Sequence, residues 1–152
     1  MKLAEALILR ADCQKRFQQL QARILRSAKV QEGDEPAENP TELIVELEAV
    51  SGELAALVKR INKTNATTPF SEALTLADVL AERDVLALRR NTYSGLAQAA
   101  SVTQERYSRS EVKFKSTVSV TEIQKRADDL AKSYRELDSR IQELNWRVEM
   151  VE

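Results

Sequence analysis

Residues 120–151 read VTEIQKRADDLAKSYRELDSRIQELNWRVEMV, and their spacing indicates the architecture of the chain. Apolar side chains recur there at alternating steps of three and four residues, the pattern of a long helix packed against other helices. They are Val120, Ile123, Ala127, Leu130, Tyr134, Leu137, Ile141, Leu144, Val148 and Val151. At about 1.5 Å per residue such a helix is roughly 45 Å long. We therefore expect its partners to be helices of similar length.

Three upstream segments repeat this pattern. We expect helices over Leu3–Lys29, Thr41–Lys63 and Leu76–Ser101. Asn39-Pro40 predicts the N-cap and first residue of the second helix, because an asparagine side chain and a proline suit those two positions. The connectors between the helices are polar and contain Pro, with Gly in the first and Asn and Thr in the second, which favours turns. The sequence thus predicts one all-α domain, residues 1–152, with four long antiparallel helices in a bundle or coiled-coil-like arrangement.

The segment before the last helix has a different pattern. Val112, Phe114, Ser116 and Val118 alternate with other residues at a period of two, which predicts a strand or an extended loop. A strand here could pair with the same segment of another subunit. Ser119 and Glu122, spaced as a capping box, predict the start of the last helix.

Composition limits the classes of function. The 152 residues are 31% charged with a net charge of −1, so we expect no nucleic-acid or membrane partner. No window approaches the roughly 20 apolar residues of a membrane span, and Met1–Leu9 contains Lys2 and Glu5, unlike a signal peptide. We expect a cytoplasmic protein on these grounds.

Histidine is absent and Cys13 is the single cysteine. The usual general base and the commonest metal ligand are therefore missing. We expect no metal and no cofactor, and the sequence offers no nucleophile and base pair that would indicate an enzyme. Cys13 lies close to the apolar seam of the first helix, which favours a buried structural thiol over a reactive one.

Two arginines interrupt apolar seams. Arg10 lies between Leu7 and Cys13, and Arg83 lies between Leu80 and Leu86. In an up-and-down bundle both would lie at one height, in a polar layer formed by Arg10, Asn62, Asn65, Arg83, Asp84 and Asn145. Such a layer could bind a small anionic ligand through its guanidiniums. It could equally be a structural network, such as Arg83 with Asp12 or Asp84, that sets helix register.

A second polar cluster consists of Arg106, Arg109, Glu111 and Lys113. It could be a loop that grips a ligand or a solvated contact between subunits. Trp146 lies off the seam of the last helix with Met150 one turn later, which predicts contact with a loop or a neighbouring subunit. With Val112, Phe114 and Val118, these two residues form the interface that we predict for a homo-oligomer.

Several motifs together resemble one protein family. They are LAEAL at residues 3–7, RAD at 10–12, VQEGDEP at 30–36, RINKTN at 60–65, RYSRSEVKF at 106–114 and ELNW at 143–146. They are similar to a family of small bacterial proteins of uncharacterised function, some labelled septicolysin. The resemblance implies an all-helical bacterial protein and carries no established chemistry.

Three hypotheses for the function follow. The first is a self-associating helical binding or scaffold protein of the cytoplasm. The alternative is a protein or enzyme that binds a small anionic ligand through the Arg10 and Arg83 layer. A cytolysin, as the family label suggests, is the remote alternative, because a single Trp and the lack of amphipathic strand pairs do not fit a pore.

Overall fold

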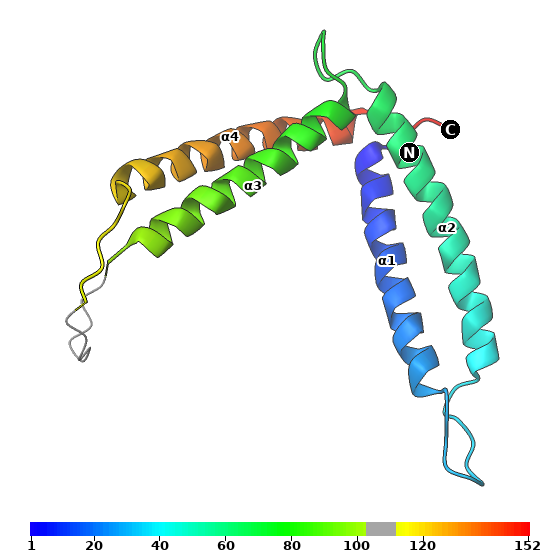
Figure 1. Cartoon of the computed structure of the whole chain (residues 1–152). Helices are drawn as coiled ribbons and strands as arrows, with labels where there is room; N and C mark the ends of the chain where they lie inside the picture. Colours follow the sequence, from blue (N-terminus) through cyan, green and yellow to red (C-terminus); the bar gives the residue numbers. More distant parts are fainter. Residues whose placement is uncertain (103–111) are drawn as a thin grey trace. The chain divides into compact units, whose positions relative to one another are not determined.

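The computed structural model describes residues 1–102 and 112–152. Four helices, α1 Leu3–Arg26, α2 Pro40–Thr67, α3 Leu76–Ala100 and α4 Val120–Arg147, account for most of the described chain (Figure 1). Outside the helices, the described residues form only two isolated β-bridges, Lys2 with Glu149 and Pro69 with Thr75. The prediction of an all-α fold with four long helices is confirmed.

The chain divides into two compact units. One contains Met1–Thr75 and Glu143–Glu152, which are the α1–α2 hairpin and the end of α4 with the residues after it. The other is Leu76–Gln142, which contains α3 and most of α4. Each unit has its own packing, and the single bundle over residues 1–152 stays a prediction. In the described part of the chain, no helix has the length and apolarity needed to cross a membrane.

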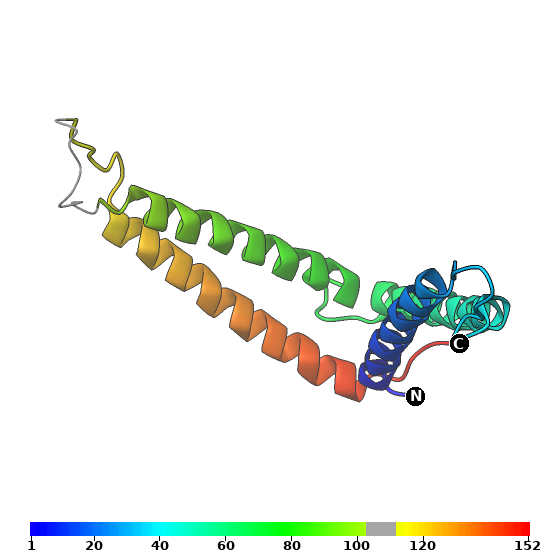
Figure 2. The same ribbon diagram turned by 90° about the horizontal axis from the view of Figure 1, so that it is seen from below.

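The α1–α2 hairpin consists of two antiparallel helices that run side by side in Figure 1 and are seen nearly end-on, next to each other, in Figure 2. Its interior is an apolar cluster of Cys13, Leu20, Leu43 and Val50. Ion pairs flank this interior, with Arg16 Nη1 3.5 Å from a Glu53 carboxylate oxygen. The predicted N-cap of α2 is confirmed, because the Asn39 side chain accepts a hydrogen bond of 3.0 Å from the Thr41 amide.

The last helix is shorter than its pattern predicts. It ends at Arg147 rather than Val151, and the following residues form an extended tail. The Leu3 amide donates to the Val148 carbonyl at 2.9 Å, and the Met150 amide donates to the Met1 carbonyl at 2.9 Å. The residues at the start of α1 thus form backbone hydrogen bonds with the tail. These bonds take the place of the further helical turn that the apolar periodicity predicts.

The second helix is longer than its pattern predicts. We expected its end near Lys63, but it continues to Thr67. The Thr64 hydroxyl lies 2.8 Å from the Arg60 carbonyl and accepts from the Val151 amide at 3.1 Å. Lys63 Nζ donates to the Glu152 backbone oxygen at 2.7 Å. The C-terminal tail therefore stabilises the last turns of α2, a contact that the local sequence does not encode.

The α3–α4 hairpin is also antiparallel, and polar contacts join its two helices. Arg83 Nη1 donates to Asp138 Oδ1 at 2.8 Å, and the Arg90 guanidinium lies 5.6 Å from the centroid of the Tyr134 ring. In the half of the hairpin that contains the end of α3 after Arg90 and the start of α4 before Tyr134, the buried residues among those described are two alanines, Ala97 and Ala127. This half of the hairpin is therefore thinly packed.

Residues 112–119, before α4, contain no strand. The extended loop that was one of the two expectations is confirmed, and a strand that pairs with another subunit stays a prediction. Val112 and Phe114 are exposed, so the alternation of apolar residues does not place them on a buried face that would stabilise a strand. Ser119 begins α4 as predicted, because its hydroxyl accepts from the Glu122 amide at 3.3 Å.

Candidate functional site

The α1–α2 hairpin has one side on which its apolar interior is open. Phe17, Ile24, Leu47 and Leu54 are partly buried and pack against the interior cluster. Each follows a buried residue of that cluster by four positions, which turns it about 40° further around its helix. Because the helices are antiparallel, the same turn on both leads to the same side of the hairpin. These four side chains therefore line one face, which we call the apolar face.

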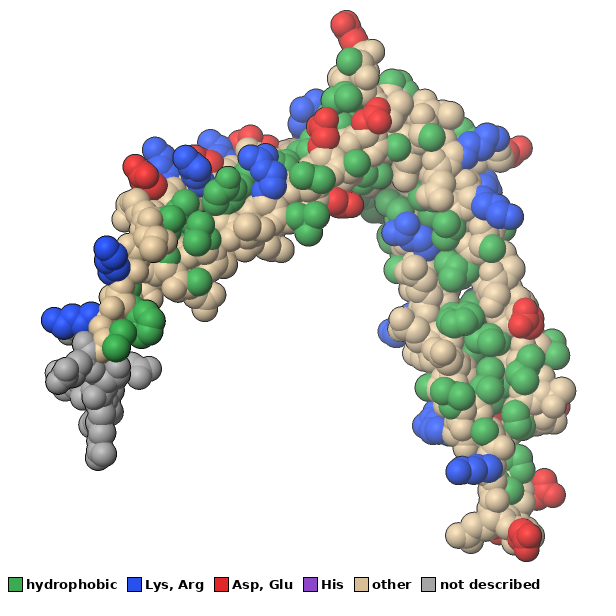
Figure 3. Space-filling view, in the orientation of Figure 1, with side chains coloured by type: hydrophobic (Ala, Val, Ile, Leu, Met, Phe, Trp, Pro, Cys, Tyr) green, Lys and Arg blue, Asp and Glu red, His purple; other side chains and the backbone are tan. Residues whose placement is uncertain are grey.

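The apolar face continues along both helices with very few charges. Its positions on α1 are Leu7, Arg10, Gln14, Phe17, Gln18, Gln21, Ile24 and Leu25, and on α2 they are Ile44, Leu47, Ser51, Leu54, Ala55, Val58, Asn62 and Asn65. Arg10 is the sole charged residue among these sixteen, and Glu48, at the position on α2 that corresponds to Gln18 on α1, adds one carboxylate at the edge of the face. Charged side chains such as Arg16, Arg23 and Glu53 lie on the other side of the hairpin. Figure 3 shows hydrophobic side chains running along this hairpin.

Two large side chains at one end of the apolar face are largely exposed. Leu25 is 69% exposed and Ile44 is 45% exposed. They extend the apolar strip beyond the partly buried Ile24 and Leu47. Apolar side chains that are contiguous and exposed on a helix pair are typical of a surface that binds another protein.

The polar layer predicted from Arg10 divides between the two units. Arg10, Asn62 and Asn65 lie on the apolar face, at the end opposite Leu25 and Ile44, and Asn145 is buried in the same unit. Arg83 and Asp84 belong to the other unit. Asn62 and Asn65 lie inside α2 rather than in a connector. The layer as a whole stays a prediction.

Arg10 has an unusual environment. Its Nε atom is buried and has no hydrogen-bond partner in the described residues. A buried donor without a partner costs about 1–3 kcal/mol. The Nε–H group of Arg10 is therefore a donor that a ligand or a second protein could satisfy.

Arg83 is paired within its own unit. Besides Asp138, its guanidinium contacts Asp84 Oδ1 at 3.3 Å, as the structural alternative predicted. Burial opposes the charge of Arg83, but the hydrogen bonds with Asp138 and Asp84 outweigh it, so the pKa of Arg83 is raised further. Sequence reasoning missed Asp138. It lies next to the seam residue Leu137 of α4. Aligning α3 and α4 as an antiparallel pair would have placed it at the same level as Arg83.

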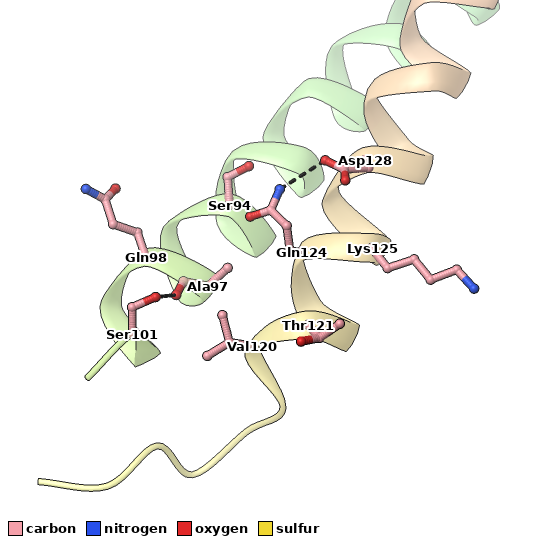
Figure 4. A pocket seen from close by; sticks show the side chains of 9 residues that line it. All are labelled: Ser94, Ala97, Gln98, Ser101, Val120, Thr121, Gln124, Lys125 and Asp128. Carbon is pink, nitrogen blue, oxygen red and sulfur yellow. Dashed lines mark hydrogen bonds between the residues drawn. The ribbon is translucent and has the colours of Figure 1, made fainter. Parts of the chain in front are cut away.

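A hollow of about 700 Å³ lies between the far ends of α3 and α4 (Figure 4). It is lined by Ser94, Ala97, Gln98, Ser101, Val120, Thr121, Gln124, Lys125 and Asp128. Gln124 Nε2 donates to Asp128 Oδ1 at 3.0 Å, and Lys125 extends away from α3. The hollow follows from the small residues Ala97 and Ala127 at the helix contact and contains no arrangement of nucleophile and base.

Cys13 lies below a second hollow of about 450 Å³ on the charged side of the α1–α2 hairpin, lined by Leu9, Asp12, Cys13, Arg16, Glu53, Ala56, Leu57 and Arg60. Its thiol is free and buried within the interior cluster. The prediction of a buried structural thiol is confirmed.

The predicted interface residues differ in exposure. Trp146 is 56% exposed, and Val112 and Phe114 are exposed too, whereas Val118 is partly buried. Met150 is 7% exposed, because the tail that carries it leaves the helix and packs against the start of α1. Its part in an interface between subunits stays a prediction. Arg106, Arg109 and Glu111 lie outside the described residues, and Lys113 is exposed.

Comparisons with known proteins identify the family. A model of a family of unknown function, DUF6847, matches residues 10–150. The chain is 51% identical to a functionally unknown conserved protein from Corynebacterium diphtheriae, over 99% of both chains, with a TM-score of 0.92 to its crystal structure. No protein of curated function matches, and neither match carries the label septicolysin. The chain therefore belongs to the family of unknown function DUF6847.

Proposed function

We propose that the protein is a self-associating helical scaffold of the bacterial cytoplasm, which acts by binding other copies or partners through the faces of its helix hairpins. The observation that carries this proposal is the amount of apolar surface that the chain leaves uncovered. Fourteen large hydrophobic residues of the described chain are exposed, including Leu25, Ile44, Leu88 and Trp146. An exposed apolar strip that follows a helix pair is typical of an association surface.

The partly buried seam residues support the same proposal. Ile123, Leu130, Leu137 and Leu144 of α4 occupy seam positions and are only partly buried, as Phe17 and Ile24 are in α1. A helix seam that remains half open in one chain can be completed by helices of a second chain. The free thiol of Cys13 fits a reducing compartment such as the cytoplasm.

Native mass spectrometry of the purified protein tests self-association, since it counts subunits and weighs any retained molecule. We expect an oligomer, and a protein that stays monomeric at tens of micromolar would refute the proposal. Trp146→Ala tests the predicted contact at Trp146, because loss of an anchoring tryptophan at an interface weakens association. An unchanged oligomer mass for this variant would remove Trp146 from the interface.

A second candidate function is the binding of a small anion at Arg10. It is favoured by the buried Arg10 Nε atom that lacks a hydrogen-bond partner in the described residues. A ligand that binds the folded state raises the melting temperature, so a thermal-shift screen with phosphates and carboxylates tests it. If no compound shifts the wild-type protein and Arg10→Leu raises stability, Arg10 has no ligand role. Cytolysin activity stays the remote alternative, and dye release from lipid vesicles tests it.

A further inference from the structure

We propose that the apolar face of the α1–α2 hairpin is the surface through which two copies of this chain pair, face to face, so that their four helices share one core. This inference rests on the proposed self-association and specifies its surface and partner. The surface is centred on Phe17, Ile24, Leu47 and Leu54 and extends to Leu25 and Ile44.

The heptad spacing of the partly exposed apolar residues on this hairpin is typical of helices that pack against a second layer of helices. Phe17 and Ile24 are seven residues apart on α1, and so are Leu47 and Leu54 on α2. The two side chains of each pair are therefore one heptad apart and point to the same side of their helix, where they can act as knobs in knobs-into-holes packing. In one chain these side chains contact the interior cluster beneath them and remain partly exposed above it. A hairpin of the same length and repeat would fill the holes between them.

The distribution of charge indicates that the partner is another copy of the same face. Burying a charged side chain without a partner is costly, so a face this poor in charge needs a partner that is equally poor in charge. On the other side of this hairpin the outer positions are rich in ions such as Arg16, Arg23, Glu46 and Glu53. The same face of a second copy of the chain satisfies this requirement.

The polar residues of the face are also suited to self-pairing. Gln14, Gln18 and Gln21 follow its edge on α1, and each amide carries both a donor and an acceptor. Such groups can hydrogen-bond to identical groups related by a two-fold axis. A two-fold interface uses one surface twice, so one substitution on the face changes the complex at two places.

The test compares substitutions at exposed positions on the face and off it. Leu25→Glu and Ile44→Glu place a carboxylate on the face, at positions that are 69% and 45% exposed and so tolerate glutamate in the single chain. Val45→Glu, next to Ile44, and Ile8→Glu, near the other end of α1 from Leu25, are the controls. Both positions point away from the face and are 67% and 53% exposed. Circular dichroism checks that each variant keeps the helix content of the wild type.

Sedimentation equilibrium of the full chain measures the dissociation constant of the dimer. We expect the two face substitutions together to raise that constant by at least about 100-fold, because four buried and unpaired carboxylates, two from each chain, enter the dimer. The two controls together should change it by less than about threefold, the scatter of surface substitutions outside an interface.

Three other results would overturn the inference, and they separate it from the proposed function. If the wild type is oligomeric and the face variants remain so, self-association stands but uses another surface. If the controls weaken the dimer as much as the face variants do, the apolar face has no special role. If the wild type is monomeric at tens of micromolar, both proposals fail.

Discussion

The two hairpins share one sequence pattern and differ in what holds their helices together. The α1–α2 hairpin encloses an apolar cluster that includes Cys13, Leu20, Leu43 and Val50. The α3–α4 hairpin is joined by the Arg83–Asp138 pair and the Arg90–Tyr134 contact. A step of three and four residues therefore defines which side of a helix faces its neighbour. A charged residue at one of those steps, such as Arg83, makes the contact polar at that point, although Leu76, Val79 and Ile141 elsewhere on α3 and α4 are buried.

The difference originates at a few seam positions. Arg10 interrupts the seam of α1 near one end, whereas Arg83 and Arg90 interrupt the seam of α3 one heptad apart, at positions that face α4. Each arginine on a seam needs a partner from the opposite helix, since an unpaired buried charge is costly. The α3–α4 hairpin supplies partners for both, and the described chain supplies none for Arg10 Nε.

The largest predicted effect concerns the apolar interior of the α1–α2 hairpin. Leu20→Ala should lower the free energy of unfolding by about 2–5 kcal/mol, because it removes a buried side chain and leaves a cavity. Leu88→Ala, at an exposed position on α3, is the control and should change it by less than about 0.5 kcal/mol. Urea unfolding followed by circular dichroism measures both. Similar losses for the two variants would contradict an apolar interior in the first hairpin.

The next effect concerns the polar contact of the α3–α4 hairpin. Asp138→Ala should lower the free energy of unfolding by about 1–2 kcal/mol, because Arg83 loses its hydrogen-bond partner on α4 and keeps only Asp84. Arg83→Leu combined with Asp138→Ala should recover most of that loss, since no unpaired charge remains. A double-mutant cycle in urea measures the coupling. Additive effects of the two substitutions would show that the pair does not join the helices.

A smaller effect should appear at the glycines of the first hairpin. Gly52 lies inside α2, and a methyl group there would meet no atom within 4 Å. Gly52→Ala should therefore raise the free energy of unfolding by about 0.5–1 kcal/mol through helix propensity. Gly33→Ala is the contrasting variant and should lower it, because Gly33 has a φ of +90°. A destabilised Gly52→Ala would indicate that another helix approaches α2 at this point.

The smallest effect concerns the pH dependence of the first hairpin. Hydrogen bonds from Lys2 and the Met1 amino group hold the pKa of Glu149 below its ordinary value of 4.5. A carboxylate with a lowered folded-state pKa stabilises the fold above its unfolded pKa, and that contribution is lost as the pH falls through the folded value. Unfolding should thus become easier below about pH 4.5, and Glu149→Gln should reduce this dependence.

Arg23 provides a matched case at the other end of the same hairpin. Its hydrogen bonds lower the pKa of Glu38, so Glu38→Gln should flatten the acid limb of the stability curve in the same way. Thermal melts between pH 3 and pH 6 measure both variants. If the variant with both Glu149→Gln and Glu38→Gln loses stability between pH 6 and pH 3 as steeply as the wild type, these two exposed carboxylates do not contribute to the pH dependence.

The number of helices, the start of α2 at Asn39-Pro40 and the burial of Cys13 could be predicted because each depends on neighbours within one or two helical turns. The ends of α2 and α4 could not, because contacts between residues distant in sequence determine them. Val151 binds Thr64 and Val148 binds Leu3 across most of the chain length. The partner of Arg83 was missed for the same reason, as Asp138 lies 55 positions away.

The sequence by itself determined that four amphipathic helices form and which residues lie along each seam, since periodicity and capping are local properties of the chain. Only the tertiary structure decided how completely each seam is buried. Covering a seam depends on the distance and register of the opposite helix, and these follow from side chains that meet across the fold. Phe17 and Leu20 both lie on the apolar seam of α1, yet Leu20 is enclosed and Phe17 remains partly exposed on the apolar face.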